Sequence, residues 1–354
     1  MSKNKDILLE RRGRCGLVTL NRPKAQNALN YGMIAQMEEH YIEWAGDADV
    51  YGIVLQAAPG PAFCSGGDLK ALYEWRQAGK TTTILGKYTS EYQHNWTLDR
   101  FTKPHVSLMD GIVFGGGVGI SLYGTHKVAG KNYRFAMPEV AIGFFPDVGA
   151  SYFLPRMPGQ TGLYLALTGD QIDRADAYAL GLLTHCIAAD EFDAIRVAMC
   201  EADPIDPVLD RRHVDPGPSA LLQMRQAIDR HFSADSVEDI LTSLESTTGP
   251  QAKWARETAQ KLRQHSPLSL KVAYRQVRRS GSPSLEDALE LEARIARHFL
   301  TGEELYEGIR ALLIDKDNSP KWPSASLENV SGETVEAYFA PAEEGAFRPI
   351  NPFV

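Results

Sequence analysis

Cysteine is scarce in this chain of 354 residues. The four cysteines, Cys15, Cys64, Cys186 and Cys200, are widely scattered, and no two of them form a C-x-x-C pair. This spacing excludes a disulfide framework and a zinc knuckle as the device that organises the fold. The sequence therefore favours a reducing compartment.

Long apolar runs are also missing. No stretch approaches the roughly 20 apolar residues that a membrane-spanning helix needs. The first residues, MSKNKDILLERRGRCG, contain no apolar segment of the kind that marks a secretory signal. We therefore predict a cytoplasmic protein without a membrane partner.

Positive charge is in deficit, with 37 Lys and Arg against 45 Asp and Glu, a net charge of -8. Such a balance disfavours nucleic acid as a partner, because the phosphate backbone is itself negative, and we predict no nucleic acid. The composition, 44% apolar and 23% charged, is ordinary for a globular protein and excludes global disorder or coiled coil. The length suits one large domain or two.

Two kinds of catalytic motif are absent as well. The nine histidines, among them His94, His105, His126 and His185, show no H-x-x-x-H or other metal-ligand spacing, so we interpret them as packing residues and predict no metal site. No G-x-S-x-G motif is present, which argues against an α/β-hydrolase.

What the sequence does contain first is an alternation of strand and helix patterns. The β-rich runs CGLVTLN (15–21) and YGIVLQAA (51–58) flank a helix-compatible segment, 28–45. A third run, HVSLMDGIVF (105–114), precedes a helix of small residues that begins near Gly116. This alternation predicts an α/β core.

We assign the core to residues 1–200, and the composition of the sequence changes after it. The segment 201–218 is rich in proline and predicts a linker, and residues 219–354 predict a largely helical region that completes the fold. Within it, SVED and SLED, beginning at Ser236 and Ser284, resemble helix-capping boxes with Asp in place of the usual Glu or Gln.

The segment after Ser284 keeps helical spacing of its apolar residues. These are Leu285, Ala288, Leu289, Ile295, Ala296 and Phe299. Charged residues fill the gaps, so we interpret the segment as an amphipathic helix packed on the core, in preference to a membrane or partner helix.

Glycines cluster at Gly115, Gly116, Gly117 and Gly119. The dinucleotide-binding motif would need a further glycine where Leu122 stands, and no Lys-Ser or Lys-Thr follows to complete a P-loop. Two interpretations remain open: a closely packed helix start, or backbone N–H groups left free to face negative charge on a ligand.

A second cluster, FCSGGDLKAL (63–72), also lies between a predicted strand and a predicted helix. Ser65 or Asp68 could simply cap that helix. Two such clusters at strand ends, however, are what an oxyanion hole with two donors requires.

Two carboxylates, Glu139 and Asp147, stand in the otherwise apolar run RFAMPEVAIGFFPDVGASYFLP. A buried carboxylate is costly unless it is paired or hydrogen-bonded, so each needs a structural partner or a chemical role. The structural alternatives are a pair between Glu139 and Arg134 and an ordinary turn aspartate at Asp147.

Taken together, VTLNRPKAQNALN, AFCSGGDLKAL, KPHVSLMDGIVFGGGVGISL and RFAMPEVAIGFFPDVGASYFLPR resemble the crotonase (enoyl-CoA hydratase/isomerase) superfamily in order and spacing. The stretches MPEVAIGFFPDVG, LALTGDQIDRADAYALGLLTH, SPLSLK and EGIRALLIDKDNSPKW resemble its 3-hydroxyisobutyryl-CoA hydrolase group. The resemblance extends from about residue 6 to residue 330. It implies a ββα spiral core with a mainly helical C-terminal region.

The resemblance also implies a role for each matched position. Crotonase enzymes polarise the carbonyl of an acyl-CoA thioester with two backbone N–H groups, which match Gly67 and Gly116. The two glutamates of the family's hydratases match Gly119 and Glu139, so one of them is missing here. Asp147 stands where hydratases typically have glycine and where the hydrolase group has its characteristic aspartate.

These assignments agree with the chemistry of thioester hydrolysis. The reaction passes through an oxyanion that two N–H donors stabilise, and loss of one donor costs about 3 to 4 kcal/mol in other enzymes. We expect Glu139 to act as nucleophile or as general base, and Asp147 to bind the substrate's 3-hydroxyl and assist proton transfer. Glu91 matches a substrate-contact glutamate, with a solvated helix-face charge as the alternative.

The phosphates of CoA need cations, and the resemblance places Arg22, Lys24 and Lys70 at such contacts. Lys316 and Lys321 are weaker candidates, and an exposed lysine needs no function.

The resemblance thus predicts an enzyme that hydrolyses 3-hydroxyisobutyryl-CoA, or a close 3-hydroxyacyl-CoA, as in valine breakdown. CoA is part of the substrate, and no other cofactor is expected. The alternatives are an enoyl-CoA hydratase or isomerase and a non-catalytic CoA-binding protein. A homo-oligomer stays open.

Overall fold

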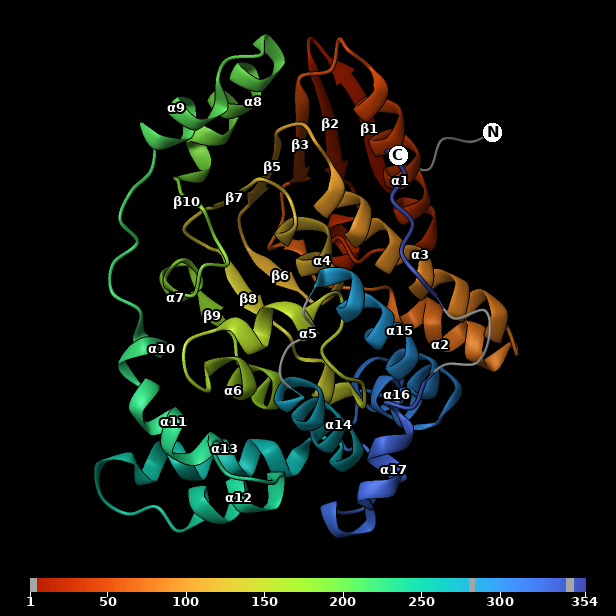
Figure 1. Cartoon of the computed structure of the whole chain (residues 1–354), viewed down its shortest axis with the longest axis vertical. Helices are drawn as coiled ribbons and strands as arrows, with labels where there is room; N and C mark the ends of the chain where they lie inside the picture. Colours follow the sequence, from red (N-terminus) through yellow and green to blue (C-terminus); the bar gives the residue numbers. More distant parts are fainter. Residues whose placement is uncertain (1–4, 280–283, 342–346) are drawn as a thin grey trace.

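The computed structural model describes residues 5–279, 284–341 and 347–354 of the chain. The strands are β1 (Ile7–Arg12), β2 (Cys15–Leu20), β3 (Gly52–Ala57), β4 (Ala62–Cys64), β5 (His105–Met109), β6 (Ile112–Phe114), β7 (His126–Ala129), β8 (Arg134–Ala136), β9 (Ile172–Asp173) and β10 (His185–Cys186). They form a six-stranded sheet in the order β1-β2-β3-β5-β7-β10 and a four-stranded sheet in the order β4-β6-β8-β9 (Figure 1).

Helices cover these sheets and form most of the second half of the chain. In the first half they are α1 (Tyr31–Gly46), α2 (Leu69–Gln77), α3 (Thr81–Arg100), α4 (Gly116–Leu122), α5 (Ala150–Phe153), α6 (Thr161–Thr168) and α7 (Arg174–Ala179). After these come α8 (Phe192–Glu201), α9 (Ile205–Asp210), α10 (Ala220–Gln223), α11 (Arg225–Phe232), α12 (Val237–Glu245), α13 (Ala252–Gln264), α14 (Pro267–Arg278), α15 (Leu285–Thr301), α16 (Glu304–Ile309) and α17 (Gly332–Ala337). Shorter turns include the 3₁₀ segment η2 (Glu139–Ile142) and the π-helical segment η6 (Arg310–Ile314). The predicted α/β class is confirmed.

The larger sheet is mainly parallel and is covered on both faces. Only β1 runs antiparallel to its neighbour β2, while β2, β3, β5, β7 and β10 pair in parallel. Alternate residues of β3 belong to two different hydrophobic clusters. Val54 is in the same cluster as Ile195 of α8, whereas Ile53 and Leu55 belong to the main core. Burial on both faces explains why these strands are apolar throughout.

The run 105–114, predicted as one strand, is two strands in two different sheets. The chain turns at Asp110 and Gly111, with β5 in the larger sheet and β6 in the smaller. Gly111 has φ +95°, and a Cβ there would lie 2.5 Å from the Pro61 carbonyl oxygen. Because the residues on both sides of this turn are apolar, the sequence pattern does not show that one strand ends and another begins.

The C-terminal helices pack directly on the core. Helix α15 packs against α3 and α5, and α14 against α6, so the helices from the end of the chain lie beside those near its beginning (Figure 1). The two capping predictions are confirmed: Ser236 and Ser284 each accept a hydrogen bond from the backbone N–H three residues on. All six apolar positions predicted for the buried face of α15 are buried.

The proline-rich segment 201–218 is not a loop throughout. It contains α9, whose residues Ile205, Val208 and Leu209 are buried. Pro204 and Pro207 lie at the start of this helix, where a missing N–H is tolerated, so proline does not prevent it. The division of the chain into core, linker and helical region stays a prediction.

None of the helices within the described ranges combines the length and the apolar character that a membrane crossing requires.

Candidate active site

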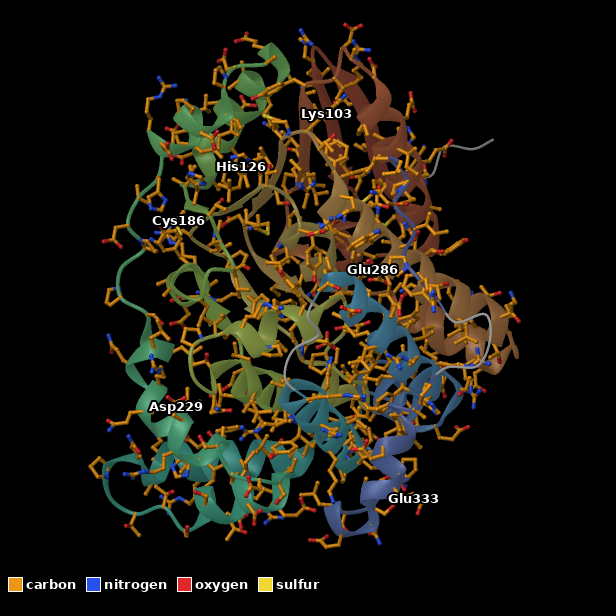
Figure 2. The ribbon with its side chains drawn as sticks, viewed as in Figure 1. Lys103, His126, Cys186, Asp229, Glu286 and Glu333 are labelled. Carbon is orange, nitrogen blue, oxygen red and sulfur yellow. The ribbon has the colours of Figure 1, made fainter. Side chains whose placement is uncertain are left out.

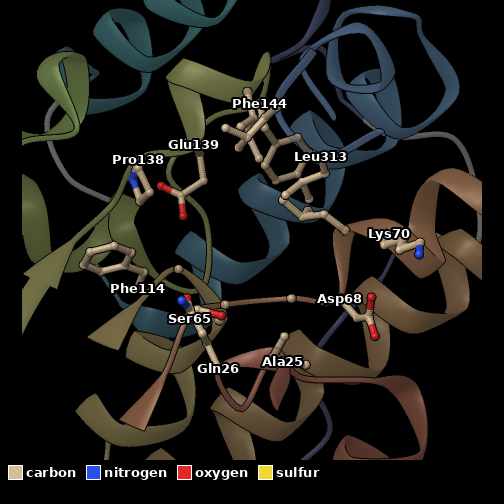
Figure 3. Close-up of a pocket in the computed structure, with 18 of the residues that line it drawn as sticks. Ala25, Gln26, Ser65, Asp68, Lys70, Phe114, Pro138, Glu139, Phe144 and Leu313 are labelled. Carbon is tan, nitrogen blue, oxygen red and sulfur yellow. The ribbon is translucent and has the colours of Figure 1, made fainter. Parts of the chain in front are cut away.

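A cavity of about 910 Å³ lies where the loops after β4 and β6 meet helix α3 and the segments η2 and η6 (Figure 3). Its lining includes the residues predicted for catalysis, for the oxyanion hole and for substrate binding, and the three stronger candidates for CoA binding: Arg22, Lys24, Gly67, Lys70, Glu91, Gly116, Glu139 and Asp147. Lys316 lines it too, whereas Lys321 is not among its lining residues. The structure thus brings the predicted residues together, and their chemical roles stay predictions.

The two glycine clusters form neighbouring turns in the cavity wall. A Cβ on Gly66 would lie 3.8 Å from the Gly116 nitrogen, and Gly66 has φ +103°, a conformation that glycine adopts readily. A bridge to Leu29 holds the first turn, since Leu29 N–H donates to the Gly66 carbonyl at 2.8 Å. Within the described ranges, the N–H groups of Gly67 and Gly116 donate to no other residue. Both N–H groups therefore remain available to a ligand oxygen.

Glu139 begins η2, directly after Pro138, and is 6% exposed. Its carboxylate points into the cavity, toward the end of β6 at Phe114 and the loop after β4 at Ser65 (Figure 3). A Cβ on Gly115 would lie 2.8 Å from Glu139 Oε1, while Oε2 has no hydrogen-bond partner among the described residues. The carboxylate thus lies beside the second glycine turn with one oxygen unengaged.

The structural alternative for Glu139, an ion pair with Arg134, is not formed. The Arg134 guanidinium donates instead to the Tyr133 carbonyl at 2.7 Å, and its residue is exposed. Glu139 therefore has no cationic partner in the described part of the chain. An unpaired buried carboxylate is typical of a catalytic site.

Asp147 is 5% exposed and accepts a hydrogen bond from the Tyr92 hydroxyl at 2.8 Å on Oδ2. Burial, then the charges of Glu91 and Glu292, raise the pKa of Asp147 well above its ordinary value. Burial, then the charge of Asp147, also raises the pKa of Glu139 well above its ordinary value. Both carboxyl groups of the site therefore hold their protons more tightly than ordinary carboxyl groups, and Glu139 does so in part because of the charge of Asp147.

Lys87 is a component of the site that the sequence reasoning missed. Its ammonium lies 3.0 Å from Glu91 Oε2, and both side chains are 4% exposed. A Cβ on Gly67 would lie 3.2 Å from Lys87 Nζ, and a Cβ on Gly116 would collide with Glu91 Oε1. The pair therefore lies across both glycine turns, and burial excludes the alternative of a solvated charge at Glu91.

Gly119, which matches a hydratase glutamate, lies outside the cavity lining. A Cβ there would lie 2.8 Å from both Asn95 Nδ2 and Val148 Cβ. Contacts under 3 Å require a neighbour to move, so the position is closed to any larger side chain. This chain therefore has no carboxylate where the hydratase glutamate would stand, and a side chain there would displace Asn95 or Val148.

The cationic side chains that line the cavity differ in whether they already bind other groups of the protein. Arg22 donates to Asp68 Oδ2 at 2.8 Å and to the Ala28 carbonyl at 2.6 Å, so it fixes the loop before α2. Lys24 and Lys70 are exposed, and Lys70 lies across the cavity from Glu139 (Figure 3). Phosphate binding is therefore better supported for the two lysines than for Arg22.

No group of three His, Cys, Asp or Glu side chains in the described ranges is arranged to hold a metal ion. His126 and Cys186, labelled in Figure 2, lie in β7 and β10 and do not line the cavity. His126 Nε2 lies 2.9 Å from Asp206 Oδ1 of α9, which fits the interpretation of this histidine as a packing residue. The four cysteines are free thiols.

Among curated proteins, the chain is similar to enzymes named 3-hydroxyisobutyryl-CoA hydrolase, mitochondrial. The protein of that name from Danio rerio is 38% identical over 351 residues, which covers 96% of this chain and 90% of the relative. The human protein of the same name is 37% identical over 353 residues, with the same coverage of each chain.

Among solved structures, one described as a carnitinyl-CoA dehydratase from Mycobacterium thermoresistibile is 39% identical with a TM-score of 0.91, covering 97% of this chain and 98% of its own. Another, described as an enoyl-CoA hydratase from Rhodobacter sphaeroides 2.4.1, is 34% identical with a TM-score of 0.89, covering 97% and 99%. Residues 15–339 match the family model of enoyl-CoA hydratase/isomerase. The chain therefore belongs to the enoyl-CoA hydratase/isomerase family and has the crotonase fold.

Proposed function

We propose that this protein hydrolyses a 3-hydroxyacyl-CoA thioester, with 3-hydroxyisobutyryl-CoA as its substrate, to the free hydroxy acid and CoA. The observation that carries the proposal is the juxtaposition of Glu139, with one unengaged carboxylate oxygen, and two glycine turns with free N–H groups. The curated relatives named as hydrolases of this thioester, at 37–39% identity, support the choice of substrate.

In the proposed reaction the thioester carbonyl oxygen accepts hydrogen bonds from the N–H groups of Gly67 and Gly116. Glu139 either takes a proton from a water that attacks the carbonyl carbon or attacks it directly to form a mixed anhydride, which water then hydrolyses. In both routes the C–S bond breaks, the CoA thiolate leaves and takes up a proton, and one water is consumed. No redox or metal chemistry is needed for this balance.

Asp147 is proposed to bind the 3-hydroxyl of the substrate. Its Oδ2 accepts from Tyr92, which leaves Oδ1 for the substrate and fixes the orientation of the carboxyl group. A site that pairs a substrate hydroxyl rejects analogues without it, because the buried group is then left unsatisfied. Isobutyryl-CoA should accordingly be a poor substrate.

Two names among the solved structures, a dehydratase and a hydratase, represent the competing reaction class. Gly119 argues against that class here, because the chain lacks the matching hydratase carboxylate and the position is too tightly packed to hold one without a neighbour moving. A CoA-binding protein without activity is the third alternative. It would not need the unpaired carboxylate at Glu139.

The test measures two reactions side by side. Release of CoA thiol is followed with 3-hydroxyisobutyryl-CoA and isobutyryl-CoA, and hydration is followed with crotonyl-CoA. The proposal predicts rapid thiol release from the hydroxy thioester alone. Dominant hydration would assign the chain to the hydratases, and turnover of none of the three would favour a binding protein.

Binding of the CoA phosphates by Lys24 and Lys70 is tested separately. Replacing both with alanine should raise KM for the CoA thioester roughly tenfold and leave kcat within about twofold, because each exposed ion pair contributes about 1 kcal/mol at most. The same variant should show an unchanged KM for the pantetheine thioester, which lacks those phosphates. Equal KM values for the CoA ester in variant and wild type would contradict this role.

The cytoplasmic location and a homo-oligomer stay predictions, and the curated relatives are named as mitochondrial.

A further inference from the structure

The turn that carries Asp147 has an unusual backbone. Val148, the next residue, has φ +50°, and Gly149 has φ +88°. A β-branched residue rarely adopts the left-handed conformation, so this turn is strained by itself. Such a conformation persists when surrounding groups hold it in place.

Glu292 of α15 supplies the central contact to this turn. Its Oε2 accepts a hydrogen bond from the Gly149 N–H at 2.6 Å, and its Oε1 accepts one from the Ser151 N–H at 2.7 Å. The side chain is 0% exposed. Both carboxylate oxygens are therefore used to fix the backbone directly after Asp147.

Two further side chains hold the same turn. The Gln276 amide of α14 donates to the Pro146 carbonyl at 2.7 Å, and the Tyr123 hydroxyl donates to the Val148 carbonyl at 2.6 Å. Backbone groups before and after Asp147 are thus held by Gln276 of α14 and by Tyr123, which directly follows α4. Glu292 and Gln276 both belong to the region after residue 219.

A carboxylate at position 292 is unfavourable in energy because it is buried. In the described ranges Glu292 has no cationic partner, and burial raises its pKa to about 7 against the lowering effect of its hydrogen bonds with Ser151 and Gly149. A glutamine could not replace it, because its amide NH₂ would face one of the two N–H donors. What the carboxylate provides is a pair of acceptors aimed at adjacent backbone donors.

We propose that Glu292 is a positioning residue, which acts through the backbone of Gly149 and Ser151 to hold Asp147 against the substrate. The inference rests on the proposed function, since it assigns to Asp147 the recognition of the 3-hydroxyl. The C-terminal helical region then supplies part of the active site, and selectivity depends on α15.

The experiment is a double-mutant cycle of Asp147→Asn and Glu292→Gln. The measured quantity is the ratio of kcat/KM for 3-hydroxyisobutyryl-CoA to kcat/KM for isobutyryl-CoA. Glu292→Gln should lower this ratio roughly 10- to 100-fold, the scale expected for a misplacement of about 1 Å. In the Asp147→Asn background the same change should lower it less than about threefold, because the two residues act as one unit.

A matched control is Glu304→Gln. Glu304 is also a buried carboxylate of the C-terminal helices, but it accepts from the Ser266 hydroxyl and does not touch the Asp147 turn. Its variant should keep the selectivity ratio. If Glu292→Gln proves insoluble, Gln276→Leu removes the bond to the Pro146 carbonyl and should show the same dependence on Asp147.

Amide hydrogen exchange separates this inference from the proposed function. Exchange at Gly149 and Ser151 should be faster in Glu292→Gln than in wild type, whether or not the enzyme turns over. Unchanged exchange, or losses that multiply in the double variant, would overturn the role of Glu292 while wild-type hydrolysis stands. Wild-type inactivity toward both thioesters would overturn the proposed function, and with it the role in selectivity.

Discussion

Replacing Lys87 with methionine tests the electrostatics of the cavity wall. The change keeps the length of the side chain, removes the ammonium that lies 3.0 Å from Glu91 Oε2, and leaves that carboxylate 4% exposed without its partner. Removing one member of a buried ion pair typically costs about 3 to 5 kcal/mol. We therefore expect a large loss of stability at pH 7.5.

The loss of stability should depend on pH, because Glu91 without its partner can become neutral by taking up a proton. Protonation costs about 1.4 kcal/mol for each pH unit above a glutamate's ordinary titration, or about 4.5 kcal/mol at pH 7.5 and about 1.7 kcal/mol at pH 5.5. These values set upper limits on the loss at each pH. Lys87→Met should thus destabilise the protein by up to about 3 kcal/mol less at pH 5.5 than at pH 7.5.

The assay is urea unfolding of wild type and variants at both pH values. Free energies of unfolding are compared for proteins whose unfolding free energy falls with urea concentration at the same slope. Lys87→Met/Glu91→Gln removes both charges and should recover most of the loss. The control is Lys253→Met, which breaks a pair of the same spacing with Glu257 whose side chains are 84% and 64% exposed, and should cost less than about 0.5 kcal/mol. A loss below about 1 kcal/mol at pH 7.5, or an equal loss at both pH values, would show that Lys87 does not offset a buried charge on Glu91.

Two further predictions concern the carboxylates and the closed glycine. Glu139 must be ionised to act, so kcat/KM should fall as pH falls through its raised pKa. Asp147→Asn removes a charge that raises this pKa, so the variant should lose kcat/KM only at a lower pH than wild type. A pH–rate profile that falls at the same pH in both proteins would contradict the effect of Asp147 on Glu139. Gly119→Ala should lower the unfolding free energy by about 1 to 3 kcal/mol, because its Cβ would lie 2.8 Å from atoms of Asn95 and Val148. Urea unfolding that shows no loss would mean that these neighbours yield.

The sequence predicted the parts of the site that have local signals. Turn glycines at 66–67 and 115–116 and the carboxylates Glu139 and Asp147 stand in short motifs, and the cavity brings them together. Helix caps such as Ser284 were predictable for the same reason, since the cap and its partner are three residues apart.

Features that depend on tertiary packing were not predictable. Glu292 stands in the charged stretch ELEAR and looks like a solvated residue until α15 packs on α3 and α5. Lys87 has its partner at Glu91, four residues on, but the same spacing occurs in exposed pairs such as Lys253 with Glu257. Burial alone distinguishes the two pairs, and burial is set by distant helices.

The catalytic role of Glu139 is tested most directly by release of CoA thiol from 3-hydroxyisobutyryl-CoA by wild type and by Glu139→Gln, with substrate binding measured by calorimetry for both. We expect rapid release by wild type, a loss of at least about 10³-fold in kcat for the variant, and retained binding. Thiol release by Glu139→Gln at a rate near that of wild type would contradict the assignment of the reaction to this carboxylate.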